Sequence, residues 1–176
     1  MIQFPHHVFK SRQGIRGRNY VYKKSPKFII RCDSNNQDFV ELIRQLDIEL
    51  GERYGTLQSS YGQYNLIPYI DTVVVGYVCG TPAGCGCFKK CSEKTVEIKR
   101  MYVKSEYRRK GIAVGILSEL EKWAFELRFS KAILETGIKQ PEAIGLYLKN
   151  GYLRIDNYGQ YKGMQTSICF EKDLVF

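Results

Sequence analysis

The chain has 176 residues, of which 44% are hydrophobic and 26% are charged, a composition typical of one globular domain with a sizeable core. No apolar run approaches the roughly 18 residues that a membrane span needs, and the first 30 residues contain no hydrophobic signal region. With a formal net charge of +9, we expect a basic, cytoplasmic protein that makes no contact with a membrane.

The basic residues gather at the start of the chain. Eight Lys and Arg residues precede the first acid, Asp33, so the remainder holds 27 − 8 = 19 bases and 18 acids. We therefore divide the chain into a basic leader, residues 1–26, and a nearly neutral domain, residues 27–176, for which no nucleic-acid partner is expected. The simplest interpretation of the leader is a solvated arm, while an acidic partner or an organellar transit peptide stays open.

The domain is expected to begin with a strand and a helix. Residues 27–32, KFIIRC, predict a short strand. Capping residues then precede a predicted helix that ends at Gly51. Its apolar side chains, at helical spacing, are Phe39, Leu42, Ile43, Leu46 and Leu50. Residues 52–68 are ambiguous and indicate a short helix within loops.

Three strands are expected next. Residues 71–80 and 83–91 flank the turn GTPAG, and residues 95–103, TVEIKRMYV, predict a longer strand after a polar turn. The alternation in AGCGCF is typical of a strand that places small residues on one face.

The six cysteines have no arrangement that requires a metal. Without an export signal, a reducing compartment and free thiols are favoured. The segment CGCFKKC lacks CxxC spacing, and the two histidines, His6 and His7, lie far away in the leader, so no metal is expected. The cysteines are Cys32, Cys79, Cys85, Cys87, Cys91 and Cys169.

The last third of the chain predicts two helices and three strands. Residues 131–137 form a strand, residues 140–151 a helix with Pro141 at its first position, and residues 152–158 and 166–175 a closing antiparallel pair. The other helix, which precedes the 131–137 strand, has a broad apolar face. This face is made of Val114, Leu117, Leu120, Glu121, Trp123, Ala124 and Leu127. This element order predicts an α/β fold with a mixed sheet and helices on both faces.

The segment YRRKGIAVG, residues 107–115, connects the 95–103 strand to this helix. Arg108, Arg109 and Lys110 precede Gly111, which leaves the backbone uncovered. Free amides and the helix dipole attract anions at such a helix start, so the segment predicts a phosphate or pyrophosphate site. Neither the P-loop pattern GxxxxGK[ST] nor GxGxxG after the first strand is present. Solvated arginines at a helix start are the alternative.

The residues RRKGIA, 108–113, resemble the Q/R-x-x-G-x-G/A signature of the GNAT superfamily of acyl-CoA N-acyltransferases. The resemblance covers roughly residues 27–174, because VEIKRMYV precedes the signature and LETGIKQPEAIGLYLKNGY follows it at the expected spacing. Ala113 stands where glycine is commoner. The resemblance implies a GNAT-like fold, whose mostly antiparallel sheet is splayed between two strands, and acetyl-CoA as the acyl donor.

The resemblance also implies how the cofactor is held. Amides from Arg108 to Ala113 would bind the coenzyme A pyrophosphate, and Gly115 would allow close approach. A bulged part of the 95–103 strand would pair with the pantetheine arm, and Gln140 would contact the cofactor from the next helix. The expected cofactor residues are Met101, Tyr102, Val103, Arg108, Arg109, Lys110, Gly111, Ile112, Ala113, Gly115 and Gln140.

Acyl transfer to an amine needs a base for the ammonium and an acid for the departing thiolate. Tyr147 matches the thiol-protonating tyrosine of the family; otherwise it is a packing residue. Two carboxylates compete for the role of base. Glu97 has the spacing of the histone-acetylating branch, and Glu135 that of the ribosomal-protein-acetylating branch. Either one could instead form a structural salt bridge with Lys99 or Arg100.

The acceptor site is expected in the least regular segments, residues 52–68 and 157–165. Both are rich in Tyr and Gln and nearly free of acids, with Glu52 as the exception, which favours an amine that carries a carboxylate over a polycationic tail. The candidate residues are Arg53, Tyr54, Tyr61, Tyr64, Tyr158 and Tyr161.

These residues together predict an acetyl-CoA-dependent N-acetyltransferase. Its expected partner is a small-molecule primary amine, amino-acid-like in character. The alternatives are a protein N-terminus or lysine as the acceptor, a non-catalytic acyl-CoA-binding regulatory module, and a nucleic-acid-associated protein that uses its leader. A monomer and a homodimer both stay open.

Overall fold

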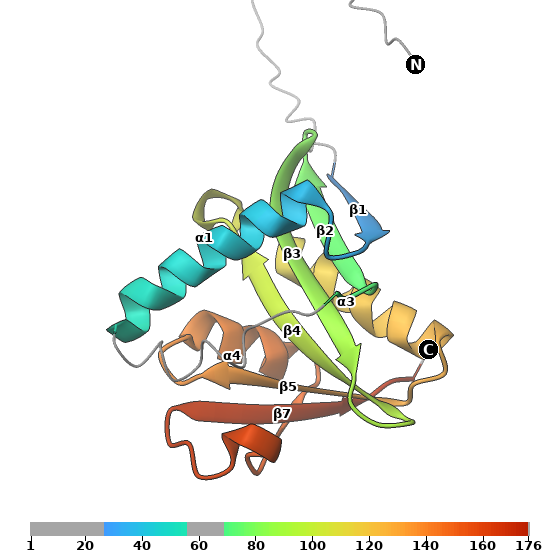
Figure 1. The fold of residues 1–176 in the computed structure, drawn as a ribbon, viewed down its shortest axis with the longest axis vertical. Helices are drawn as coiled ribbons and strands as arrows, with labels where there is room; N and C mark the ends of the chain where they lie inside the picture. The colour runs from blue at the N-terminus through green and yellow to red at the C-terminus, as the bar shows by residue number, and fades with distance from the viewer. Residues whose placement is uncertain (1–26, 56–68, 176) are drawn as a thin grey trace, which may run out of the picture.

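A computed structural model describes residues 27–55 and 69–175 as a single seven-stranded sheet with helices on both faces (Figure 1). The predicted leader and the acceptor candidates Tyr61 and Tyr64 lie outside the described residues. The strands are β1 (Lys27–Cys32), β2 (Val73–Val78), β3 (Thr81–Lys90), β4 (Thr95–Val103), β5 (Lys131–Gly137), β6 (Leu153–Ile155) and β7 (Ser167–Asp173). The predicted fold class is confirmed.

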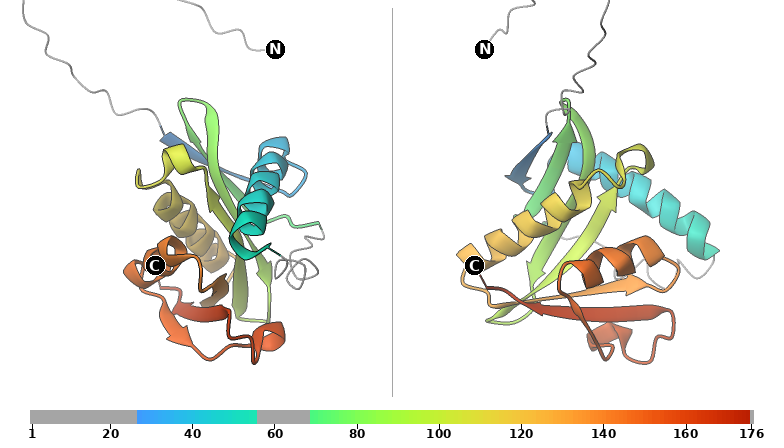
Figure 2. Two further views of the ribbon diagram at one scale, coloured as in Figure 1. Left: turned by 90° about the vertical axis from the view of Figure 1, so that its left-hand side faces the viewer. Right: turned by 180° about the vertical axis from the view of Figure 1, so that it is seen from behind.

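The sheet has the strand order β1-β2-β3-β4-β5-β7-β6. Only β4 and β5 run parallel, and β7 inserts between β5 and β6. The helix α1 (Gln37–Tyr54) covers one face, and α3 (Ile112–Glu126) and α4 (Pro141–Lys149) cover the other (Figure 2). Two short 3-10 helices, η2 (Ser105–Tyr107) and η3 (Gly159–Tyr161), lie in connections. None of the helices in the described ranges is long and apolar enough to cross a bilayer.

The first helix is one turn longer than predicted. The Asn36 side chain accepts a hydrogen bond from the Phe39 amide at 3.0 Å and caps the start of α1. The helix passes through Gly51 and ends at Tyr54, because Gly55 (φ 56°) breaks it. Tyr54 is buried, and its hydroxyl accepts a hydrogen bond from the Lys139 amide at 3.1 Å. The extra turn of α1 therefore contains Tyr54, whose tertiary contacts help to hold it in place.

The apolar face of α3 differs in part from the prediction. The helix begins at Ile112, so the buried stripe consists of Ile112, Ile116, Leu117, Leu120, Glu121 and Ala124. Val114 and Leu127 are 44% and 49% exposed, and their predicted place on this face is wrong. Glu121, the one acid in the predicted face, is indeed buried, at 5% exposure.

The alternation predicted in β3 is confirmed. Cys85 and Cys87 are buried in the cluster that contains α1, whereas Gly86 faces α3. A Cβ atom on Gly86 would lie 2.9 Å from Leu120 Cδ1, so the missing side chain lets the helix pack closely on the sheet. All six cysteines are free. Within residues 27–55 and 69–175, no group of three or more His, Cys, Asp or Glu could hold a metal ion.

The sheet splays between β4 and β5. These two strands pair only through residues 95–98 and 131–134. Beyond this point β4 stays with β3 through a register shift opposite Cys85 and Cys87, where Arg100 adopts φ 57°, and β5 continues with β7. One edge of residues 99–103 thus loses its strand partner, which leaves main-chain groups available to a ligand.

Candidate active site

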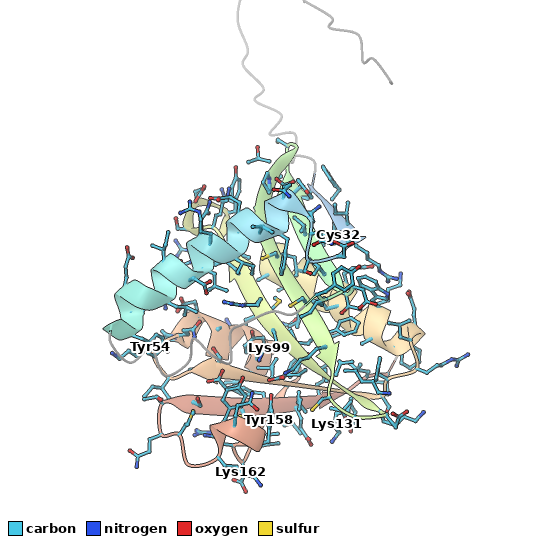
Figure 3. All side chains as sticks on the ribbon, viewed as in Figure 1. Cys32, Tyr54, Lys99, Lys131, Tyr158 and Lys162 are labelled. Carbon is cyan, nitrogen blue, oxygen red and sulfur yellow. The ribbon has the colours of Figure 1, made fainter. Side chains whose placement is uncertain are left out.

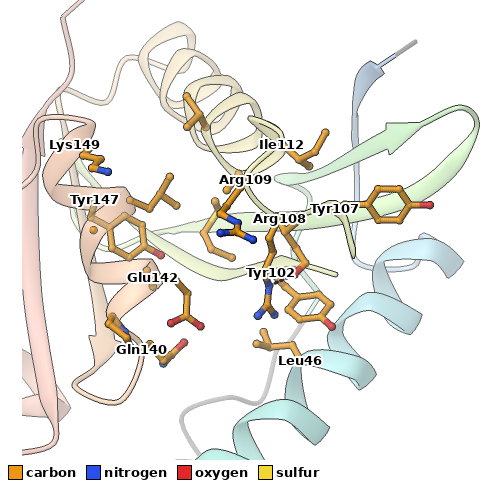
Figure 4. Close-up of a pocket in the computed structure, with 18 of the residues that line it drawn as sticks. Leu46, Tyr102, Tyr107, Arg108, Arg109, Ile112, Gln140, Glu142, Tyr147 and Lys149 are labelled. Carbon is orange, nitrogen blue, oxygen red and sulfur yellow. Dashed lines mark hydrogen bonds between the residues drawn. The ribbon is translucent and has the colours of Figure 1, made fainter. Parts of the chain in front are cut away.

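A cleft of about 450 Å³ occupies the splayed region (Figure 4). Side chains of α4, such as Gln140 at its N-cap and Tyr147, lie across the cleft from those of β4 and the β4–α3 connection. Leu46, Glu49 and Leu50 of α1 complete the lining. Most predicted cofactor residues line this one cleft, namely Met101, Tyr102, Val103, Arg108, Arg109, Gly111, Ile112, Ala113 and Gln140.

The start of α3 presents uncapped amides to the cleft. Gly111 is the N-cap in a left-handed conformation (φ 81°), no side chain caps the helix, and its first turn contains no acid. None of the amides of residues 109–114 donates a hydrogen bond to another described residue. A Cβ atom on Gly111 would have no neighbour within 4 Å, so the space in front of the amides is open. This arrangement fits an anion such as pyrophosphate.

Two predicted cofactor residues lie outside the cleft lining, and one amide is already used. Lys110 donates to the Glu106 carbonyl at 2.7 Å. A Cβ atom on Gly115 would lie 2.9 Å from Ile29 Cδ1, so the glycine here lets α3 approach β1. The amide of Arg108 donates to the Ser105 carbonyl at 3.2 Å. The free amides of this turn therefore begin at residue 109.

A chain of ion pairs crosses the cleft and was not predicted from the sequence. Glu49 of α1 accepts from Arg108 at 2.5 Å and from Arg53 at 2.6 Å, and Arg53 also pairs with Glu142 of α4. Arg108 Nε donates to the Val103 carbonyl at 2.8 Å. The helical spacing of Glu49 and Arg53 is visible in the sequence, but their partners lie far away along the chain. The network ties α1 to both other walls of the cleft.

A second, polar cavity of about 90 Å³ adjoins the cleft. It contains all three predicted catalytic residues, Glu97, Glu135 and Tyr147. The two cavities share lining residues from α1, β4 and α4, namely Leu46, Leu50, Met101, Gln140, Ala143 and Tyr147. Tyr147 therefore stands where the cleft and the smaller pocket meet.

Glu97 is buried at 3% exposure and is fully engaged by donors. Its two oxygens accept from Lys99 at 3.2 Å and from Lys89 at 3.1 Å. The phenols of Tyr158 and Tyr161 add hydrogen bonds at 3.2 and 3.4 Å; Lys99 and Tyr158 are labelled in Figure 3. Two ammonium groups and two phenols therefore occupy the carboxylate oxygens of Glu97. The alternative of a structural salt bridge with Lys99 is realised here.

Glu135 has a different environment. Its carboxylate accepts one short hydrogen bond, from Ser167 Oγ at 2.6 Å. Burial raises the pKa of the Glu135 carboxyl above its ordinary value, although the Ser167 hydrogen bond and the Lys99 charge act in the opposite direction. A carboxylate that is desolvated and not saturated by cations can accept a proton near neutral pH.

Tyr147 is 5% exposed, and burial followed by the Glu135 charge raises its phenol pKa. The hydroxyl is therefore protonated at neutral pH and able to donate. Of the described acceptor candidates, Tyr161 lines the smaller pocket and Tyr158 reaches it through Glu97. Arg53 and Tyr54 instead bind α1 to Lys139, in the segment before α4, and Arg53 also pairs with Glu142 in the first turn of α4.

The comparisons with known proteins agree with this geometry. A family model described as the Acetyltransferase (GNAT) family matches residues 34–152. A protein of Azospirillum brasilense named IAA acetyltransferase is 32% identical over 152 residues, which cover 85% of this chain and 99% of that protein. A Klebsiella pneumoniae structure described as an acyl-CoA N-acyltransferase has a TM-score of 0.68 and 27% identity, covering 85% of this chain and 98% of the other.

A third similarity shows the fold alone. The PaiA N-acetyltransferase of Thermoplasma acidophilum, solved in complex with coenzyme A, has a TM-score of 0.60 and 19% identity over 84% of this chain and 99% of that one. The splayed sheet and the matches together define an enzyme of the N-acetyltransferase class. The chain belongs to the GNAT acetyltransferase family, and the resemblance stated from the sequence is confirmed.

Proposed function

We propose that this enzyme transfers an acetyl group from acetyl-CoA to the primary amine of a small, amino-acid-like molecule, with Glu135 as the general base and Tyr147 as the general acid. The observation that carries the proposal is the convergence of the two cavities at Tyr147, with Glu135 in the smaller one. Acetyl-CoA would supply an acyl group activated as a thioester, and the chain supplies binding, orientation and proton transfer.

The cleft residues fit the donor in two places. The free amides at 109–114 would hold the pyrophosphate, and the unpaired edge of Met101–Val103 would hold the pantetheine amides. The structurally similar PaiA N-acetyltransferase was solved in complex with coenzyme A, which supports coenzyme A as a ligand of this fold. The shared lining residues then leave the reacting end of the donor beside Tyr147 and the smaller pocket.

The smaller pocket fits the acceptor amine. Glu135 takes a proton from the ammonium, directly or through one water, and Tyr147 gives its proton to the thiolate that leaves. The ammonium of Lys99, whose side chain is 12% exposed, lines the same pocket and offers a partner for a carboxylate on the acceptor. Glu97 neutralises Lys99 and Lys89 and so limits repulsion of the amine.

Thiol release from acetyl-CoA with matched amines tests the acceptor. Phenylalanine and phenethylamine form one pair, methionine and 3-(methylthio)propylamine another, and a lysine peptide represents protein acceptors. We expect turnover with the amino acids and at least about tenfold lower kcat/KM with the decarboxylated amines, since one charged hydrogen bond accounts for that much. Lys99→Met should remove the preference. Turnover of the peptide alone would support a protein acceptor, and release with none of a broad amine panel would support the non-catalytic module.

The anion site is tested by one pair of variants at Gly111. Asp and Asn both tolerate the left-handed conformation, so Gly111→Asp and Gly111→Asn differ mainly in charge. We expect the Asp variant to bind coenzyme A about tenfold more weakly than the Asn variant in calorimetry, because a carboxylate there caps the amides and repels pyrophosphate. The difference should shrink at high salt. Equal affinities would place the pyrophosphate elsewhere.

A further inference from the structure

The ring of Tyr147 packs against a second buried tyrosine, Tyr152. The two ring centroids are 5.7 Å apart at an interplanar angle of 62°. Tyr152 is 1% exposed, and its amide donates to the Tyr147 carbonyl at 3.1 Å, so the residue closes the end of α4 as well. The ring centroid of Phe170, in β7, lies 5.9 Å from that of Tyr147. Tyr147 is thus held by aromatic neighbours that do not line the acceptor pocket.

An ion pair whose carboxylate is buried lies next to Tyr152. Glu121, in the middle of α3, is 5% exposed, and its Oε2 accepts from Lys172 Nζ of β7 at 2.7 Å. Lys172 Nζ also lies 5.6 Å from the centroid of the Tyr152 ring. None of these three residues lines either cavity. Glu121 therefore takes no direct part in the proposed acyl transfer, although a carboxylate is costly to bury.

Two polar atoms in this cluster lack a partner in the described part of the chain, Glu121 Oε1 and Tyr152 OH. One is an acceptor and the other a donor. Lys172 Nζ is a neighbour of both residues, since it donates to Glu121 Oε2 and lies over the Tyr152 ring. Burial and then the Glu121 charge raise the pKa of Tyr152. Polar groups of this kind in an aromatic core require an explanation other than packing.

We infer that Tyr152 is a positioning residue for Tyr147 and that the Glu121–Lys172 pair fixes the Tyr152 ring; this rests on the proposed role of Tyr147 as the acid. Glu121 belongs to α3, whose first turn forms the anion site. The cluster therefore connects the helix that would bind the pyrophosphate to the ring on which Tyr147 packs. It sets the distance between the phenol and the thiolate that it protonates.

Steady-state kinetics on Tyr152→Leu, in the wild-type and in the Tyr147→Phe background, test the inference. We expect kcat to fall about tenfold or more in the wild-type background, because small misplacements of a catalytic group are costly, while KM for acetyl-CoA changes less than twofold. In the Tyr147→Phe background the same change should have almost no further effect on kcat. Phe88→Leu is the matched control, since Phe88 is buried in the same core and contacts Trp123 and Phe129 instead.

NMR spectroscopy provides a second test that does not depend on turnover. In protein labelled with ¹³Cζ-tyrosine, the resonance assigned to Tyr147 should shift in Tyr152→Leu and, to a smaller extent, in Tyr152→Phe and Glu121→Gln, but not in Phe88→Leu. The two milder variants keep the test valid if Tyr152→Leu does not fold. Equal losses of kcat in both backgrounds, or an unmoved Tyr147 resonance in all the Tyr152 variants, overturn the positioning role and leave the acid assignment intact. A Tyr147→Phe enzyme with wild-type kcat overturns the acid role and the inference with it.

Discussion

Glu135→Gln should lower kcat by about 10²- to 10⁴-fold, the usual contribution of a general base, and leave the affinity for coenzyme A nearly unchanged. The amide keeps the shape of the side chain and can still accept the Ser167 hydrogen bond, but it cannot take a proton from the ammonium. Stopped-time assays of thiol release and calorimetric titration with coenzyme A measure the two quantities. A matching loss of affinity would indicate a structural role instead.

The same variant should be more stable than the wild type at neutral pH. Because burial raises the pKa of Glu135, the folded state favours the protonated form. This stabilising contribution is complete below the unfolded pKa, near 4.3, and is lost as the pH rises through the folded pKa. Glutamine imitates the protonated form, so the gain should appear at pH 7 and disappear near pH 4. A free-energy gain of about 1 kcal/mol corresponds to a Tm increase of about 2–4 °C.

Glu97→Gln is the control, and its effect on stability should have the opposite sign. Removing this charge leaves two lysines near one another without their shared partner, and breaking a buried pair costs about 3–5 kcal/mol. We expect a lower Tm and a smaller loss of kcat in the protein that remains folded. If the folded Glu97→Gln enzyme loses more activity than Glu135→Gln, the assignment of the base is reversed.

Tyr147→Phe should also lower kcat by about 10²-fold or more, since it removes the donor for the thiolate and retains the buried ring. The ring contacts with Tyr152 and Phe170 remain, so the Tm should change little. Kinetics at saturating acetyl-CoA and amine, together with thermal unfolding, measure both effects.

Tyr161→Phe is the matched control for this prediction. Tyr161 lines the same pocket and its phenol is directed to Glu97 and Lys99 instead of the cleft. We expect KM for the amine to rise and kcat to change less than about fivefold, because the hydroxyl positions other groups and transfers no proton. Comparable losses of kcat in the two variants would remove the distinction on which the acid assignment is based.

Much of the fold could be predicted from the sequence because local signals and tertiary packing agree. Alternation in AGCGCF, Pro141 at a helix start and the glycine before α3 all specify the observed elements. The incorrect predictions concern positions where tertiary contacts decide the length of a helix or the direction of a side chain. Tyr54 extends α1 past a glycine, and Val114 turns to the cleft instead of the core.

The candidate site was predictable in position more than in chemistry. The spacing along β4 and β5 brought Glu97 and Glu135 into one pocket, and no local pattern distinguished them. The two carboxylates differ because Glu97 is contacted by Lys89 of β3 and by Tyr158 and Tyr161 from the region around η3. The network of Glu49, Arg53, Arg108 and Glu142 was missed for the same reason, because its members meet only in the folded chain.

The junction of the two cavities at Tyr147 has a kinetic consequence. The donor in the cleft and the acceptor in the smaller pocket would occupy adjoining cavities that share a few side chains, so both could be bound at once. No cysteine lines either cavity among the described residues, and we propose that the amine attacks the thioester directly. We therefore infer a ternary complex, and double-reciprocal plots of initial velocity should intersect; parallel lines would indicate an acylated enzyme and contradict direct attack.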